Sequence, residues 1–304
     1  MSDTASSEYF EILELHDREF QKLSVESQIY CVPVDALEEQ RLENQHQVLR
    51  YLFDDRLFFP PIKFPRRILD CGYGRGHWAL DMALNYPQSE VTAIDLYPAP
   101  ELPDDQPDNL ECEVWDLNEP LVPSYKPNTY DLIHSRFVAP GIKKHRWPGY
   151  MRDMCRLLRP GGWVQTVELY YIIQSDSGLL TDGHALMHWS NGYRYSMDSD
   201  RDPRAGRNLG QLMRNAGLAD IHEVTYRLPI GGWPTDPKMR HVGELNLENF
   251  GAMLDSLAVW PFVEKLKWSK AQVAALTCKA REEAKDTRLK LYMPLTVVWG
   301  RRRA

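Results

Sequence analysis

The sequence predicts a doubly wound α/β fold with a mainly parallel sheet. Between residues 61 and 170, short apolar runs alternate with polar segments of helical periodicity, which is the pattern of consecutive βαβ units. The apolar runs are continuous rather than alternating, as expected for strands that helices cover on both faces. A glycine-rich turn follows the first of these runs, where open α/β sheets bind their ligands.

The elements of this region can be placed in order along the chain. Five apolar runs predict strands, and two of the segments between them predict helices. The second helix ends at Arg159-Pro160-Gly161-Gly162, which is a helix stop followed by a turn. The predicted strands cover residues 67–70, 91–96, 110–115, 130–135 and 163–169, and the predicted helices cover residues 77–86 and 147–158.

The chain before and after this region predicts additional helices and two more strands. Residues 1–60 are expected to form an N-terminal helical extension, and residues 61–304 the main domain. Two final strands that interrupt the βα rhythm indicate an antiparallel end to the sheet, and a helical insertion at about 236–286 between them is expected to form a lid. The predicted helices are 8–23, 35–53, 181–195, 207–216, 237–266 and 269–285, and the two strands are 221–228 and 289–299.

Composition limits the class of protein. The length of 304 residues suits one large domain or two small ones. The net charge of −7 argues against nucleic acid as a partner, because phosphate binding needs a basic face. We expect no membrane association, since no apolar run approaches the ~18 residues of a span, and no secretion signal is visible. The five cysteines lie far apart, so we expect no metal site and a cytoplasmic or nuclear location.

The glycine-rich turn carries the most specific signal. Asp70 ends the first strand, and Gly72, Gly74 and Gly76 follow at alternate positions before a helix begins. Glycine lets the backbone adopt left-handed conformations and lets a ligand approach closely. A dinucleotide fingerprint would need a glycine where His77 stands. The pattern therefore favours a ligand with a ribose and an amino acid but no phosphate, such as S-adenosylmethionine (SAM).

Two further acidic residues end the next two strands. Asp95, followed by Leu96, lies about 20 residues beyond the turn, where a carboxylate meets ribose hydroxyls in nucleoside-binding α/β folds. Asp116, followed by Leu117, is placed to accept a hydrogen bond from an adenine amino group. Each acid alone is also explained as a cap of its loop, whereas the two together with the glycine turn favour a nucleoside site.

These motifs resemble the class I SAM-dependent methyltransferases, and within them the fungal LaeA-like group of secondary metabolism. The similarity in sequence motifs spans about residues 30–170. The later part of the chain resembles the family only in the expected order of its helices and strands. The matching segments are Tyr30-x-x-Pro33-x-Asp35-x-x-Glu38-x-x-Arg41-Leu42, residues 70–76, Asp131-Leu132-Ile133-His134, Leu158-Arg159-Pro160-Gly161-Gly162-Trp163 and Val167-Glu168.

The resemblance implies a seven-stranded Rossmann-like sheet in the order 3-2-1-4-5-7-6, with SAM across the carboxyl ends of strands one, two and four. The three glycines would line the methionine and ribose, Asp95 would hold the ribose, and Asp116 would face the adenine. The segment His134-Ser135-Arg136 would lie beside the sulfonium. The implied cofactor-binding residues are Asp70, Gly72, Gly74, Gly76, Asp95, Leu96, Asp116, Leu117, His134 and Tyr30.

Candidate catalytic residues follow from the chemistry of methyl transfer. Orientation of the acceptor and removal of water supply much of the acceleration, so a strong base is optional. His134 is the first candidate for a base and Glu168, one strand over, is the second. A structural role explains His134 equally well, and it is the simpler interpretation of Glu168. His184 and His188 have the spacing of metal ligands, but nothing completes a set, and an ordinary helix face is the simpler interpretation.

Two main functions remain open at this stage, beside a third in which the fold keeps SAM but catalyses a rearrangement without methyl transfer. The first is methylation of an O, N or S atom on a small apolar or aromatic molecule. The second is a LaeA-like regulatory protein that uses the fold to bind protein partners, and a homodimer is compatible with either. In both cases we expect the segment from Tyr30 to Leu42 to close over the cofactor, because two helices cannot bury a core of their own. Packing on the back of the sheet or in a dimer interface is the alternative.

Overall fold

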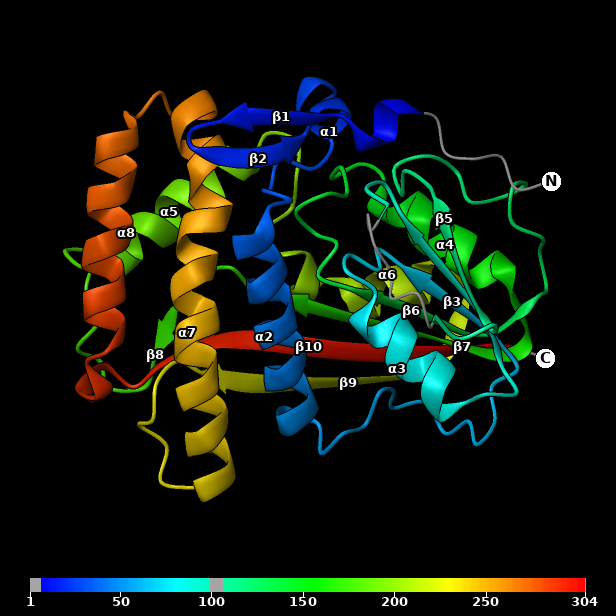
Figure 1. The fold of residues 1–304 in the computed structure, drawn as a ribbon. Helices are drawn as coiled ribbons and strands as arrows, with labels where there is room; N and C mark the ends of the chain where they lie inside the picture. Colours follow the sequence, from blue (N-terminus) through cyan, green and yellow to red (C-terminus); the bar gives the residue numbers. More distant parts are fainter. Residues whose placement is uncertain (1–6, 99–105, 304) are drawn as a thin grey trace.

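A mixed sheet forms the centre of the molecule (Figure 1). The computed structural model describes residues 7–98 and 106–303. Five strands run parallel, and β9 and β10 complete the sheet in antiparallel fashion. The spatial order confirms the expected 3-2-1-4-5-7-6 arrangement, with the two-residue strand β8 (Gln174–Ser175) beside the start of β10. In this order the strands are β5 (Leu110–Val114), β4 (Glu90–Asp95), β3 (Arg67–Cys71), β6 (Tyr130–Arg136), β7 (Leu158–Leu169), β10 (Leu291–Arg302) and β9 (Leu218–Pro229).

The helices fall into two groups. Three short helices accompany the strands, and they are α3 (His77–Asn85), α4 (Trp147–Leu157) and α6 (Leu209–Asn215). A second group gathers beside the sheet, where α7 lies between α2 and α8 and α5 packs against α8 (Figure 1). This group contains α2 (Ala36–Leu52), α5 (Ala185–Met197), α7 (Pro237–Trp260), which continues as a π-helical turn (Pro261–Lys265), and α8 (Lys270–Ala284). The lid insertion predicted at 236–286 thus corresponds to α7 and α8.

The expected helix at 8–23 is wrong. After a 3₁₀ turn (Ser7–Phe10), the chain forms a hairpin from β1 (Ile12–Leu15) and β2 (Arg18–Gln21), followed by α1 (Lys22–Glu26). His16 and Asp17 form its two-residue turn with φ of 55° and 62°. Two consecutive positive φ values match the twist of a hairpin and are incompatible with a helix. The apolar spacing alone cannot reveal this reversal.

The strand β7 begins earlier than expected. The chain passes from α4 directly into β7 at Leu158, so the Arg159–Gly162 motif lies in the strand and not in a separate turn. The parallel register with β6 shifts there, because Tyr130 pairs with Leu158 while Leu132 pairs with Trp163. A Cβ at Gly162 would lie 2.8 Å from the carbonyl oxygen of Tyr130, so a glycine is needed for this close approach.

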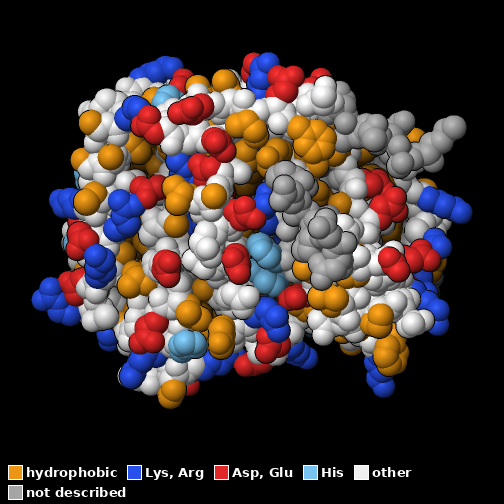
Figure 2. All heavy atoms as spheres, viewed as in Figure 1, with side chains coloured by type: hydrophobic (Ala, Val, Ile, Leu, Met, Phe, Trp, Pro, Cys, Tyr) orange, Lys and Arg blue, Asp and Glu red, His pale blue; other side chains and the backbone are white. Residues whose placement is uncertain are grey.

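One hydrophobic core joins the N-terminal extension to the sheet. Val48, Leu49 and Leu52 of α2 belong to the same buried cluster as Leu69 of β3 and Ile133 of β6. On the face of the molecule shown in Figure 2, acidic and basic side chains are intermixed. None of the helices in the described residues is long and apolar enough to cross a membrane.

Candidate active site

A cleft opens at the carboxyl ends of the parallel strands, where β3, β4, β5 and β6 pass into their loops. Its other walls come from the N-terminal segment and from α2 and α7. Seven of the sequence-predicted residues line it, namely Tyr30, Gly72, Gly74, Asp95, Leu96, Asp116 and Leu117. Asp70, Gly76, His134 and Glu168 do not line the cleft. The strand-end motifs thus converge on one cavity, as the parallel topology requires.

The glycine turn forms the floor of the cleft. Gly72 and Gly74 have φ of 79° and 58°, a region that side chains disfavour. A Cβ at Gly72 would lie 2.5 Å from Cγ1 of Val138, so no side chain fits there. Gly76 has φ of 80° and occupies the N-cap position of α3. Its role is to begin the helix, while Gly72 and Gly74 face the cavity.

Asp95 anchors the turn and retains free acceptor capacity. Its Oδ2 accepts a hydrogen bond from the Gly74 amide at 2.8 Å, and its Oδ1 accepts one from the Tyr97 amide at 3.1 Å. Burial raises the pKa of this carboxyl to about 6, against the effect of these two donors. Each carboxylate oxygen has a second lone pair. Asp95 can therefore accept hydrogen bonds from two hydroxyl groups of a ligand.

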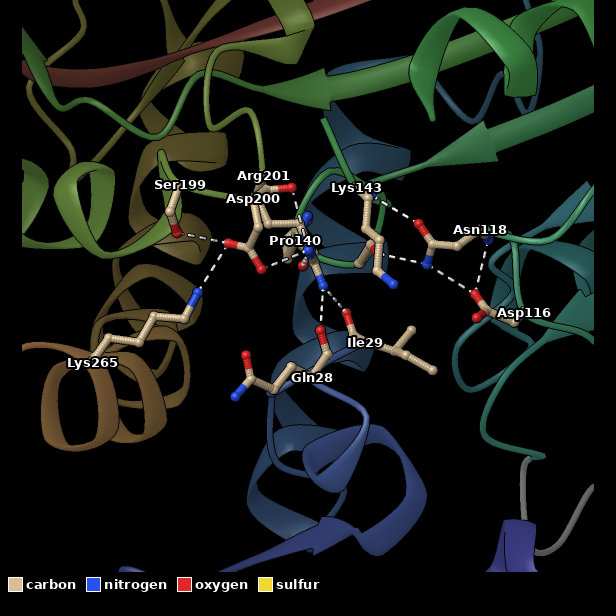
Figure 3. A network of polar contacts seen from close by, with 11 residues as sticks. Gln28, Ile29, Asp116, Asn118, Pro140, Lys143, Ser199, Asp200, Arg201 and Lys265 are labelled. Carbon is tan, nitrogen blue, oxygen red and sulfur yellow. Dashed lines mark hydrogen bonds and ion pairs between the residues drawn. The ribbon is translucent and has the colours of Figure 1, made fainter. Parts of the chain in front are cut away.

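Asp116 lies close to Asp95, because the amide of the preceding Trp115 donates to the carbonyl of Asp95 at 2.9 Å. One oxygen of Asp116, Oδ1, accepts both bonds from Asn118, from the backbone amide at 2.8 Å and the side-chain amide at 2.9 Å. Asn118 also donates to the carbonyl of Gly141 at 3.0 Å and accepts from the amide of Lys143 at 2.8 Å (Figure 3). The indole nitrogen of the adjacent Trp115, which also lines the cleft, is buried without a hydrogen-bond partner among the described residues.

Two basic residues line a further part of the wall. The guanidinium of Arg136, at the end of β6, lies 3.4 Å from Nδ1 of His46, and no carboxylate oxygen of the described residues lies within 4 Å of it. Burial lowers the pKa of Arg136 to about 10. His77, the first residue of α3, stacks on His46 with ring centroids 5.6 Å apart. Burial lowers the pKa of His77, which keeps its imidazole neutral at pH 7. This wall is thus suited to an anion.

The remaining wall is mostly apolar. Met253 and Leu257 of α7 face Tyr30 and Tyr171 around the cavity. A buried ion pair lies in the same wall, in which Arg41 donates to both oxygens of Glu38 at 2.8 and 2.6 Å. Because these charges neutralise each other, this wall presents no net charge to a ligand. The contribution of α7 has no counterpart in the sequence motifs, since nothing in its pattern indicates which side chains reach the cleft.

Comparisons with known proteins identify the family. A family model described as a methyltransferase domain matches residues 44–223. The methyltransferase pytC of Aspergillus terreus is 32% identical over 259 residues, which cover 84% of this chain and 78% of the relative. The chain belongs to the class I SAM-dependent methyltransferases.

Other relatives lie in the LaeA-like group of methyltransferases. The secondary metabolism regulator laeA of Aspergillus flavus is 27% identical over 283 residues, covering 91% of this chain and 74% of the relative. The protein-methionine methyltransferase laeA of Emericella nidulans is 27% identical over 278 residues, covering 90% and 72%. Among solved structures, a phosphoethanolamine N-methyltransferase of Haemonchus contortus shares 18% identity with a TM-score of 0.49. That match covers 85% of this chain and about half, 53%, of the solved chain.

The cleft of this methyltransferase fits SAM. A Cβ at Gly74 would meet only Cδ1 of Leu42 at 4.0 Å, so the backbone of the turn is open to a ligand there. Asp95 has acceptor capacity for a ribose diol, and Arg136 offers a cation that forms no ion pair within 4 Å among the described residues. Arg75, within the glycine turn, donates to Oε1 of Glu39 at 2.5 Å, and its charge is therefore neutralised. SAM is the cofactor of the family, and it supplies a methyl group on a positively charged sulfur.

The expectation that His134 opens into the cofactor cleft is not met in this methyltransferase. The imidazole is 2% exposed, and its Nδ1 lies 2.9 Å from Oδ1 of Asp70. Its ring stacks on Trp78 with centroids 3.7 Å apart. Burial lowers the pKa of His134, against the effect of Asp70. His134 and Asp70 thus form a buried pair beneath the glycine turn, and the geometry gives no support to the role of base.

Glu168 also lies behind the cleft wall. Its Oε1 accepts hydrogen bonds from the amides of Val138 and Ala139 at 2.8 and 3.2 Å. Its Oε2 is buried without a partner in the described part of the chain. Burial raises the pKa of Glu168 to about 8, so the carboxyl is mostly protonated at pH 7. Glu168 holds the loop that contacts Gly72 and does not itself face the cavity.

His184 is the N-cap residue of α5, and His188 lies on the helix. His184 makes its hydrogen bonds with Thr181, three residues earlier in the chain. Within residues 7–98 and 106–303, no group of three histidine, cysteine, aspartate or glutamate side chains is arranged to hold a metal ion.

Proposed function

We propose that this methyltransferase transfers a methyl group to an O, N or S atom of a small, largely apolar or aromatic molecule in fungal secondary metabolism. One observation carries the proposal: the cleft that fits the cofactor is also lined by apolar side chains from the N-terminal segment and from α7, and we call this part of the cleft the acceptor chamber. A concave, mostly apolar cleft with a few polar groups is the usual form of a small-molecule site.

The cofactor is assigned to this cleft as follows. Asp95 accepts from both ribose hydroxyls, and Asp116 accepts from the adenine amino group. Arg136 and His77 receive the methionine carboxylate, because a buried cation without a carboxylate partner gains most from an anionic ligand. Asp70, Gly76 and His134 act indirectly through the shape of the turn. The residues in direct contact are Tyr30, Gly72, Gly74, His77, Asp95, Leu96, Asp116, Leu117 and Arg136.

The polarity of the chamber supports an apolar acceptor. Of the four carboxylates that line the cleft, Glu38 pairs with Arg41 and Glu39 pairs with Arg75. Asp95 and Asp116 are assigned to the nucleoside. A charged acceptor would therefore find no free partner on the α7 side of the cleft, whereas an aromatic or aliphatic one is stabilised by Tyr171, Met253 and Leu257.

Catalysis in this proposal relies on orientation and the exclusion of water. Neither His134 nor Glu168 reaches the cleft, so neither accepts the proton of the acceptor directly. A held acceptor and a dry cavity provide a large part of the acceleration of a displacement at a cationic sulfur. We therefore assign His134 and Glu168 as positioning residues, and the acceptor as a group that is nucleophilic near neutral pH.

A second function is favoured by the relatives that are named as regulators. The laeA proteins match nine-tenths of this chain, and one of them is named as a methyltransferase of protein methionine. In that case the partner is a protein, and the location includes the nucleus as well as the cytoplasm. The mixture of charges on the face shown in Figure 2 agrees with either acceptor class but not with nucleic acid.

One experiment distinguishes these functions. The protein is incubated with SAM labelled in its methyl group and with fungal extract separated into small-molecule and protein fractions. We expect label in an apolar small molecule, and the Asp95→Ala protein serves as the inactive control. Label found only in proteins would contradict the small-molecule acceptor and favour the regulatory function.

A further inference from the structure

A buried arginine connects the two walls of the cofactor cleft. Arg201 lies between α5 and the 3₁₀ turn Ala205–Arg207, and it is only 2% exposed. Its Nη2 donates to the carbonyls of Gln28 and Ile29 at 2.5 and 2.7 Å, and its Nε donates to the carbonyl of Pro140 at 3.1 Å (Figure 3). One guanidinium thus binds the N-terminal segment and the loop between β6 and α4.

The residues that follow these carbonyls meet at the cleft. Tyr30 follows Ile29, and Gly141 follows Pro140, and both line the cofactor cavity. A Cβ added at Gly141 would lie 3.3 Å from Cδ2 of Tyr30, so the tyrosine ring packs directly on the glycine backbone. Arg201 therefore holds together two segments whose contact closes one side of the cleft.

The guanidinium is itself held in place by the helices beside the sheet. Its Nη1 donates to Oδ2 of Asp200 at 2.9 Å, and Oδ1 of Asp200 accepts from Lys265 at 3.0 Å (Figure 3). Lys265 ends the π-helical turn that follows α7. The Lys144 amide also donates to the Asp200 carbonyl at 2.8 Å. Asp200 and Lys265 thus connect the guanidinium of Arg201 to the end of α7, the helix that lines the acceptor chamber.

We propose that Arg201 is a positioning residue that locks the Tyr30 segment onto the Pro140–Gly141 loop and thereby sets how slowly the cofactor leaves the cleft. The inference rests on the proposed placement of SAM. Hydrogen bonds from a charged donor to buried carbonyls are among the stronger ones, and their loss leaves those carbonyls unpaired. When these hydrogen bonds are weakened, the Tyr30 segment separates from the Pro140–Gly141 loop more often. The main effect is therefore expected on the rate at which the cofactor dissociates.

The test compares Arg201→Lys and Arg201→Met with Arg204→Met. Lysine keeps the charge but lacks the planar fork that reaches carbonyls on two segments. Arg204 lies on the same segment, its side chain is 41% exposed, and within residues 7–98 and 106–303 its ion pairs are with the nearby Asp198 and Asp202. We expect dissociation of S-adenosylhomocysteine, followed by stopped-flow tryptophan fluorescence, to be about tenfold faster in Arg201→Met. Arg201→Lys should show a smaller increase, and Arg204→Met none.

A cycle with Tyr30→Ala separates this role from general stability. Because Arg201 acts through Tyr30, the double variant should dissociate the ligand little faster than Tyr30→Ala alone. Additive effects, or unchanged dissociation in a folded Arg201→Lys protein, would overturn the proposal. Failure of the wild-type protein to bind the ligand would instead contradict the cofactor site. In that event the rate of tryptic cleavage at Lys22 tests the role of Arg201 without a ligand. If Arg201 holds the Tyr30 segment in place, cleavage should be faster in Arg201→Lys than in Arg204→Met.

Discussion

Asp95 combines two functions in one carboxylate, because it fixes the glycine turn and keeps lone pairs for the cofactor. Removing it in Asp95→Ala leaves the Gly74 and Tyr97 amides and the ribose hydroxyls without their acceptor. We expect the affinity for S-adenosylhomocysteine to fall by about 1–3 kcal/mol, or roughly 5- to 150-fold. Titration calorimetry on the two proteins measures this difference, and equal affinities would contradict the assignment.

The raised pKa of Asp95 predicts a pH dependence of cofactor binding. Hydroxyl groups donate to the ionised carboxylate, and burial places its pKa at about 6 in the ligand-free protein. Affinity should be constant above about pH 7 and should weaken as the pH falls through 6, because a proton must be displaced before the ligand binds. Asp95→Asn should bind more weakly and lose this step. A wild-type profile that is flat between pH 5 and 8 would refute the role of ionised Asp95.

Glu168 should affect stability rather than chemistry. Its pKa is raised to about 8 in the folded protein, above the value of about 4 in the unfolded chain. The folded state therefore binds the extra proton between these values, and this carboxyl lowers the free energy of unfolding as the pH rises from 4 to 8. In Glu168→Gln the side-chain carbonyl oxygen still accepts from the amides of Val138 and Ala139, but the side chain no longer binds or releases a proton. Urea unfolding should show a larger gain for Glu168→Gln at pH 8 than at pH 5.

Activity of the same variant provides the discriminating control. A positioning role predicts that Glu168→Gln retains most of the methyl transfer rate, whereas a general base would cost roughly 10²–10⁴-fold. Loss of activity on that scale in a stable variant would restore Glu168 as a catalytic candidate.

At the residue scale, the sequence predicted correctly that the strand-end acids Asp95 and Asp116 lie in the cleft. It did not predict that His134 lies outside the cleft. Asp95 and Asp116 lie at loop junctions, where the backbone directs them to the sheet edge. His134 lies within β6, in register with Asp70 of β3. His134 and Arg136 are two residues apart and therefore point to the same face of the strand, but Trp78 covers His134. Arg136 reaches the cleft because it stands where that strand ends.

At the scale of elements, the N-terminus of α2 depends on a single carboxylate. Asp35 caps the helix by accepting from the Glu38 amide at 3.1 Å, and Arg18 of the hairpin donates to both of its oxygens at 2.5 and 2.8 Å. Asp35→Ala should lower the free energy of unfolding by about 1–2 kcal/mol. Glu282→Ala, which breaks an exposed pair with Lys285, should cost less than about 0.5 kcal/mol. Thermal unfolding of both variants tests the difference, and equal costs would contradict it.

The elements show where periodicity is informative. Continuous apolar runs identified the buried parallel strands, because both faces of these strands are covered. The hairpin of β1 and β2 was taken for a helix, because the apolar residues of such short strands also fit helical spacing and the turn at His16-Asp17 lacks glycine. The extension of β7 through Arg159–Gly162 was also missed, since glycine and proline normally signal a turn.

At the scale of the whole molecule, the division into an extension and a main domain does not follow the packing. The N-terminal segment supplies cleft residues such as Tyr30, and α2 supplies part of the central core through Val48 and Leu52. The helical insertion meets α2 from the other side through α7. The cofactor cleft is therefore built from three stretches of chain that are far apart in sequence, and its closure is a property of the whole fold.

Two truncations should separate closure of the cleft from formation of the core. Removing residues 1–34 deletes the hairpin and Tyr30 but leaves α2, so we expect a folded protein that binds S-adenosylhomocysteine more weakly than the full chain. Removing residues 1–60 also deletes α2 and exposes the apolar surface of α7 that it covers. A single buried methylene contributes roughly 0.8 kcal/mol, so the loss of several large side chains exceeds the stability of most domains. We expect the 61–304 fragment to aggregate or to unfold without cooperativity. Circular dichroism and calorimetry measure both outcomes, and a stable 61–304 fragment with full cofactor affinity would show that the extension is an independent domain.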